Sequence, residues 1–194
     1  MSDYLTLANN LKNELKLEKE PVAVKIFEKE EDASAILPKF DGKARHCGMV
    51  YEAQNGKSFY STIDEHTCLK GAKILGLAQN DNDPIVPYLE KESEAIAYAP
   101  LKEANFKADS VLIYVTPIQA KDLAKMYRVK VGKRFRGDFY AAFSLCSDAT
   151  IIPMKTNEPN LTLGCGGSRK DGHIEDYEEV IGLTIDNLES LFDN

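Results

Sequence analysis

The size and charge of the chain exclude several classes of protein. With 194 residues, 43% of them hydrophobic, and a formal net charge of −7, it has the composition of a globular protein with a sizeable core. The negative charge argues against binding to nucleic acid or to an anionic membrane. No apolar run reaches the roughly 18–20 residues that a membrane-spanning helix needs. The N-terminus has no basic segment followed by an apolar one, so we expect no secretory signal and a cytoplasmic location.

The first half of the chain alternates helical and strand-like patterns. Residues 3–17 carry apolar side chains at helical spacing and predict an amphipathic helix, which ends before Pro21. The β-branched run 22–27 predicts a strand. The patterns that follow predict, in order, a helix at 45–54, a strand at 58–63, a helix from 67 or 68 to 75, and a loop at 80–87.

The second half repeats this alternation. The continuous apolar run 111–115 is typical of a central strand that is covered on both faces, and Pro117 ends it. The remaining patterns predict a strand at 95–99, a helix around 120–127, a helix-leaning segment at 138–151, a short strand at 161–164 and a helix at 185–193. We therefore predict an α/β (or α+β) protein with a mixed sheet and a single domain over residues 1–194.

All four cysteines fall in a frame that occurs twice. Cys47 and Cys68 are 21 residues apart, and Cys146 and Cys165 are 19 apart. Each pair encloses a polar turn and a short predicted strand, and each follows an apolar strand. This order suggests two similar halves, at about 20–80 and 108–190. Internal duplication and chance similarity both explain it.

Thiols stay reduced in the cytoplasm, so these cysteines are expected to serve metal binding or catalysis rather than disulfides. Four separate cysteines, without the close C-x-x-C pairs common in zinc sites, favour a larger centre such as a 4Fe–4S cluster. Glycines around Cys165 would allow close backbone approach to it. Zinc or copper(I) bound by the four thiolates is an alternative. A second alternative is a metal-free thiol redox enzyme that uses Cys68 or Cys165. The simplest interpretation is that the cysteines are buried hydrophobic side chains without a chemical role.

Basic side chains near the second pair are candidates for holding an anion. Arg134 and Arg136 belong to a basic run that precedes Cys146, and Arg169 follows Cys165 closely. Arginine binds carboxylate and phosphate groups through paired hydrogen bonds, although a solvated turn is the simpler explanation of the run. His46 and His66 lie beside the first cysteine pair and are weaker candidates for a metal.

Several segments resemble an uncharacterised prokaryotic family of unknown function that is known as ArCR. The resemblance covers about residues 5–190. The segments that carry it are Pro21-Val22-Ala23-Val24-Lys25, Cys47-Gly48-Met49-Val50, Cys68-Leu69-Lys70-Gly71-Ala72, Cys146-Ser147-Asp148 and Gly164-Cys165-Gly166-Gly167-Ser168-Arg169. It implies a site shared by the four cysteines and supplies no reaction. The family's association with anaerobic microbes agrees with an oxygen-sensitive cluster. The partners we expect are a small anionic ligand or a redox partner, and a homodimer, the commonest assembly.

Overall fold

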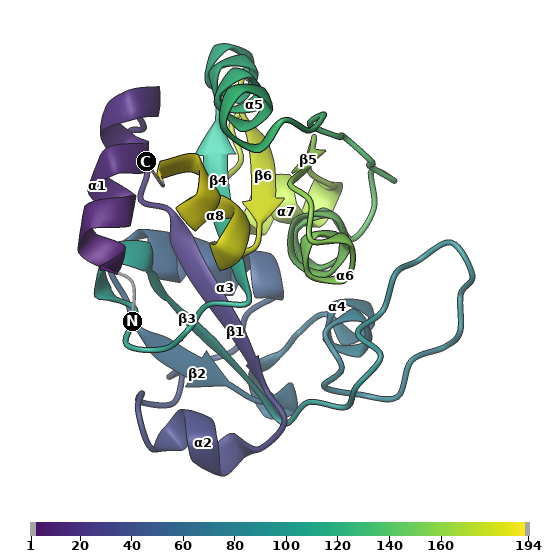
Figure 1. Cartoon of the computed structure of the whole chain (residues 1–194). Coiled ribbons are helices and arrows are strands. Elements are labelled where there is room, and N and C mark those ends of the chain that lie inside the picture. The colour runs from purple at the N-terminus through teal and green to yellow at the C-terminus, as the bar shows by residue number, and fades with distance from the viewer. Residues whose placement is uncertain (1–2, 193–194) are drawn as a thin grey trace.

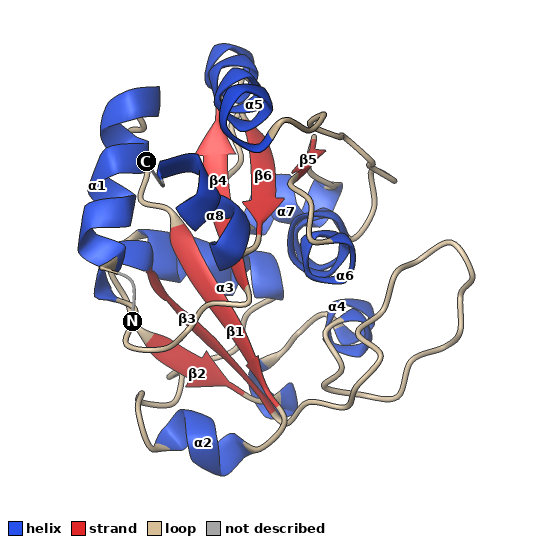
Figure 2. Cartoon of the chain, in the orientation of Figure 1, coloured by secondary structure: helices blue, strands red, loops and turns tan. Residues whose placement is uncertain are grey.

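Six strands form one sheet in the computed structural model of the protein, which describes residues 3–192. The strands are β1 (Val22–Phe27), β2 (Phe59–Ser61), β3 (Ala95–Pro100), β4 (Ser110–Val115), β5 (Asn160–Thr162) and β6 (Glu179–Leu183). Their order across the sheet is β2-β3-β1-β4-β6-β5. The central strands β1 and β4 are therefore the ones that lead the two predicted halves (Figure 2).

Helices cover both faces of this sheet (Figure 1). They are α1 (Tyr4–Leu15), α2 (Glu30–Ser34), α3 (His46–Gln54), α4 (Leu69–Ile74), α5 (Pro117–Val131), α6 (Ile152–Thr156), α7 (Gly166–Asp171) and α8 (Ile185–Phe192), with a π-helical segment η3 (Ser144–Ile151). Helices α1, α5 and α8 pack in one hydrophobic core. Helices α3 and α4 and segment η3 pack in the other. No helix in residues 3–192 is both long and apolar enough to cross a membrane.

The two-sided cover explains the continuous apolar run of β4. Successive side chains of a strand point to opposite faces. Val111, Ile113 and Val115 accordingly enter the core with α1, α5 and α8, whereas Leu112 and Tyr114 enter the core with α3 and α4. Both faces of β4 are buried, so its sequence has no polar alternation.

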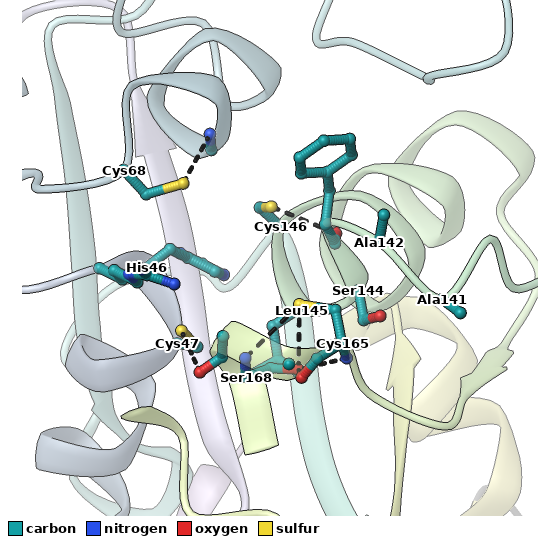
Figure 3. A pocket seen from close by; sticks show the side chains of 15 residues that line it. His46, Cys47, Cys68, Ala141, Ala142, Ser144, Leu145, Cys146, Cys165 and Ser168 are labelled. Atoms are coloured by element: carbon teal, nitrogen blue, oxygen red, sulfur yellow. Dashed lines mark hydrogen bonds between the residues drawn. The ribbon is translucent and has the colours of Figure 1, made fainter. Parts of the chain in front are cut away.

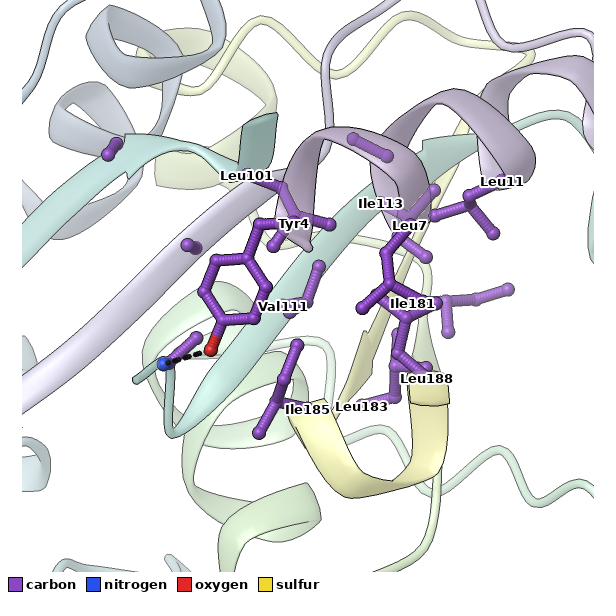
Figure 4. Packing of buried hydrophobic residues seen from close by; sticks show 14 of the residues in the cluster. Tyr4, Leu7, Leu11, Leu101, Val111, Ile113, Ile181, Leu183, Ile185 and Leu188 are labelled. Carbon is purple, nitrogen blue, oxygen red and sulfur yellow. Dashed lines mark hydrogen bonds between the residues drawn. The ribbon is translucent and has the colours of Figure 1, made fainter. Parts of the chain in front are cut away.

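Helix α1 is held on the sheet by a narrow apolar stripe. Tyr4, Leu7 and Leu11 point from it toward the sheet and α8 (Figure 4). Asp3 caps its N-terminus, because its carboxylate accepts the backbone N–H of Thr6 at 3.3 Å. The helix therefore begins where a capping residue precedes the first apolar side chain.

Replacing Leu11 with alanine tests this packing. Leu11 is fully buried, so we expect Leu11→Ala to lower the free energy of unfolding by about 2–5 kcal/mol through lost contacts and a cavity. Leu5 lies on the same helix but is 52% exposed, so Leu5→Ala should change the free energy of unfolding by about 0.5 kcal/mol or less. Urea unfolding of the two variants measures the difference. Equal losses would mean that α1 is not docked on this face.

The pairing of the strands has two-fold symmetry. At the centre, Ala23 of β1 faces Val111 of β4, and the flanking pairs are Val22 with Leu112 and Val24 with Ser110. A half-turn about the central pair exchanges β1 with β4, β3 with β6, and β2 with β5. In both halves the chain runs from a central strand through a cysteine-bearing helix to the edge strand, and then through a second cysteine to the strand between them. The boundaries of the halves, 20–80 and 108–190, and their origin by duplication stay predictions.

The α/β class is confirmed, but the sheet differs from the mixed one that we predicted. Every pairing between two strands of residues 3–192 is antiparallel. Parallel pairing is confined to isolated bridges such as Lys39 with Tyr60. The run 111–115 correctly indicated a strand covered on both faces, but such a strand is continuously apolar whichever way its neighbours run, so it does not reveal their direction.

Candidate functional site

The four cysteines come from four separate segments and face one cavity. Cys47 is the second residue of α3, Cys146 lies in η3, and Cys68 and Cys165 immediately precede α4 and α7. In Figure 3 their sulfurs surround a common space. All four line a cavity of about 290 Å³ on the sheet face that carries α3 and α4. The fold thus brings together all the cysteines of the sequence.

Cys68 and Cys165 occupy the same structural position in the two halves. Each is the N-cap of a short helix, and each sulfur accepts the backbone N–H three residues later. The donor is Gly71 for Cys68, at 3.4 Å, and Ser168 for Cys165, at 3.5 Å. Oxygen-bearing side chains usually fill this position. A sulfur there has an N–H donor aimed at it, which stabilises a thiolate or a metal-bound thiolate.

Cys165 has additional donors around its sulfur. Burial raises the pKa of its thiol, but the Ser168 hydroxyl and the backbone N–H groups of Ser144, Ser168 and Gly167 outweigh burial, so the pKa is lowered. The Ser168 hydroxyl lies 3.4 Å from the sulfur. Cys165 is therefore the cysteine whose surroundings favour the thiolate.

Cys47 and Cys146 are more deeply buried, and each is about 8% exposed. Burial raises the pKa of the Cys47 thiol to about 12, and the negative charges of Asp171 and Cys165 add to this. Burial also raises the pKa of Cys146, and thiolates at Cys68, Cys165 and Cys47 raise it further. Cys146 is thus close enough to interact electrostatically with all three other sulfurs. Without a bound cation, the two deep cysteines are protonated at neutral pH.

Gly71 keeps the space between two sulfurs of different halves free. A Cβ atom at this position would lie 3.5 Å from the Cys68 sulfur and 3.7 Å from the Cys146 sulfur. Both are ordinary contact distances, so an alanine would fit against the cysteines but would occupy the space between them. The glycine three residues after Cys68 was visible in the sequence, but its position beside Cys146 was not.

The segment before Cys146 has an unusual backbone. Ala141 and Phe143 have positive φ angles of 60° and 56°, which cost roughly 1–2 kcal/mol per non-glycine residue. The π-helical segment begins directly afterwards, at Ser144. The sequence of residues 138–151 was ambiguous between helix and strand and leaned helical, and regular helical structure begins only at 144. Strained residues and π-helical turns are frequent at functional sites.

His46 lines the cysteine cavity, but both it and His66 are engaged in hydrogen bonds. Both ring nitrogens of His46 have hydrogen-bond partners, the Tyr98 hydroxyl at 2.9 Å and the Thr150 hydroxyl at 3.2 Å. Burial lowers the pKa of His46 to about 3, so it is neutral. His66 pairs with the Ser61 hydroxyl. Among residues 3–192, no three histidine, cysteine or acidic side chains are close enough together to hold one metal ion.

The arginines that the sequence suggested do not line the cysteine cavity. Arg136 is 72% exposed at its side chain and pairs with Glu158. Arg169 donates hydrogen bonds to the carbonyl groups of Leu163, Glu175 and Glu178, so it ties down a loop. Arg134 is exposed in the loop after α5. A role for these three in binding an anion stays a prediction.

Arg45 is the arginine that lines the cavity, and sequence reasoning missed it. Its guanidinium Nε lies 3.1 Å from a carboxylate oxygen of Asp171. The only signal in the sequence was its place two residues before Cys47. No spacing of residues in the sequence connects Arg45 with Asp171, which lies more than a hundred residues later in the chain.

Comparison with known proteins identifies the relatives of this chain. The sequence profile of the family DUF169, described as Uncharacterised ArCR, matches residues 10–86 and 84–194. The chain belongs to the DUF169 family. The two matched segments together contain all four cysteines. Over 209 aligned residues, the chain is also 31% identical to a Methanocaldococcus jannaschii protein named Uncharacterized protein MJ0308. That match covers 95% of this chain and 90% of the relative. No solved structure matches the chain.

Proposed function

We propose that this DUF169 protein holds a 4Fe–4S cluster through Cys47, Cys68, Cys146 and Cys165 and uses it for electron transfer or redox chemistry. The observation that carries the proposal is the convergence of these four sulfurs, from both halves of the chain, on one cavity. Cysteine thiolates are the usual ligands of such clusters. When bound, the cluster would accept and return single electrons.

The spread of the sulfurs favours a cluster over a single ion. Zinc–sulfur bonds of about 2.3 Å place the thiolates of a tetrahedral site within about 4 Å of one another. The described residues hold no group of three or more such donors placed to bind one metal ion. A cluster core is larger than one ion, and its ligands can approach from separate segments. The alternatives are zinc or copper(I) bound by the thiolates, which would require the four segments to move together, and metal-free thiol chemistry.

The surroundings of the sulfurs support the same choice. N–H groups that point at cluster sulfurs tune reduction potentials. Here the backbone N–H groups of Gly71 and Ser168 point at Cys68 and Cys165. The cluster would be held by a buried pair, Cys47 and Cys146, and by a half-exposed pair, Cys68 and Cys165, which lies nearer to solvent.

Metal analysis of anaerobically prepared protein tests the proposal. After reconstitution with iron and sulfide we expect a brown protein with about four irons and four sulfides per chain. Cys146→Ala should lose most of this iron, because Cys146 is the cysteine near all the others. A colourless protein that retains one zinc would replace the cluster with a single-ion site. A protein without metal that forms a reversible disulfide would point to thiol redox chemistry.

The proposed function also implies a cellular location and an assembly for the protein. We propose a cytoplasmic location, where the thiols stay reduced, and a homodimer that exchanges electrons with a redox partner. Light scattering on the reconstituted protein would give the mass of the assembly, and a mass of one chain would contradict the dimer.

A further inference from the structure

A second hollow lies beside the cysteine cavity, and Arg45 lines both. This hollow has a volume of about 460 Å³, within the usual range of small-molecule sites. Lys43, Lys170 and His173 are among the other residues that line it. The ring of His173 stacks on Tyr51 with centroids 4.0 Å apart, which forms part of its wall. The hollow is thus shaped by the same helices, α3 and α7, that carry Cys47 and follow Cys165.

The side chain of Arg45 is about half exposed and is paired with Asp171. Asp171 binds its Nε, at 3.1 Å. Gly167 makes room for the other end of the guanidinium, because a Cβ at Gly167 would lie 2.5 Å from the Arg45 Nη1 atom. Within residues 3–192, Nη1 and Nη2 form no hydrogen bond or ion pair. A guanidinium paired through Nε, with its outer N–H groups free, can bind an oxyanion through two hydrogen bonds.

The charges around the hollow favour an anion. Its lining has three basic residues, Lys43, Arg45 and Lys170, and two acidic ones, Glu52 and Asp171. Asp171 pairs with Arg45, and Glu52 pairs with Lys57 from outside the lining. Among residues 3–192, Lys43 and Lys170 form no ion pair, and both are exposed. The hollow therefore carries excess positive charge in a protein whose net charge is −7.

We propose that this hollow binds a small oxyanion, a carboxylate or a phosphate ester, with Arg45 as its main ligand. Arg45 also borders the cysteine cavity, so the anion would lie beside the sulfurs. The anion site goes beyond the cluster and does not depend on it. The sequence led us to expect a small anionic ligand bound by Arg134, Arg136 and Arg169. The site inferred here would bind a ligand of that class through Arg45 instead.

Calorimetric titration tests the site. The full-length protein, both as purified and after removal of any metal, is titrated separately with inorganic phosphate and with succinate at constant ionic strength. We expect saturable binding of at least one anion, and which one binds identifies the class of ligand. Arg45→Gln should weaken it tenfold or more, as expected for the loss of charge-assisted hydrogen bonds. Arg136→Gln is the matched control and should bind as the wild type does, because Arg136 is remote from the hollow's lining.

A second variant changes the position of the Arg45 guanidinium without removing its charge. Gly167→Ala keeps Arg45 but forces its flexible guanidinium tip to move, so it should also weaken binding without unfolding the protein. Wild-type protein that binds neither anion, or an Arg45→Gln variant that binds like the wild type, would overturn the anion site. Neither result would affect the cluster, because binding is also measured without metal. Conversely, loss of the cluster proposal would leave Arg45-dependent binding intact.

Discussion

Gly71→Ala is expected to remove most of the reconstituted iron while leaving the protein folded. The added methyl group would lie 3.5 Å from the sulfur of Cys68 and 3.7 Å from that of Cys146, in the space that a cluster between them must fill. It makes no close contact with the protein, and alanine is favoured over glycine in helices by up to about 1 kcal/mol. Stability should therefore be unchanged or slightly higher, while iron falls at least several-fold. Iron analysis and urea unfolding of the same preparation measure both effects.

Gly137→Ala is the matched control for this experiment. A Cβ at Gly137 would meet its nearest neighbours only at 3.8 Å, and the residue does not line the cysteine cavity. It should therefore retain the iron content of the wild type. If Gly71→Ala also retained full iron, the space between Cys68 and Cys146 would not be where the cluster binds. This pair of variants is more informative than a cysteine substitution, because it removes no ligand.

Gly182→Ala is expected to lower the free energy of unfolding by more than about 3 kcal/mol. A Cβ at Gly182, in β6, would lie 1.8 Å from the carbonyl oxygen of Ala149 in η3. That oxygen cannot move freely, because it accepts a hydrogen bond from the Ser110 hydroxyl at 3.0 Å. The substitution must therefore push η3 away from the sheet, and Cys146 belongs to η3. Any variant that folds should consequently also bind less iron.

Urea unfolding measures this loss against Gly166→Ala. No atom lies within 4 Å of a Cβ at Gly166, so its stability should stay within about 1 kcal/mol of the wild type. Normal stability and iron content in Gly182→Ala would contradict the close packing of η3 on β6.

Local sequence patterns were sufficient for the elements that lead to the site. The apolar periodicity of residues 3–17 predicted α1, and the β-branched run 22–27 coincides with β1. The helix predicted at 45–54 is α3. Strand β6 was missed, because no pattern was assigned to residues 179–183. The preceding Glu178 is only 8% exposed and pairs with Lys19, which comes just before β1.

The sequence alone identified the four cysteines as the candidate site. Their residue type, their repeated frame and the glycines near them are local properties of the chain, and they led to the four cysteines that line the cavity. Only the tertiary structure decided which other side chains join them. Arg45 lines the cavity through its contacts with Asp171 and Gly167, and Gly71 lies beside Cys146. His46 is engaged by Thr150. These contacts join residues about 75 or more positions apart, and they depend on how β1 and β4 pair. Periodicity, which reports only on near neighbours, contains no information about them.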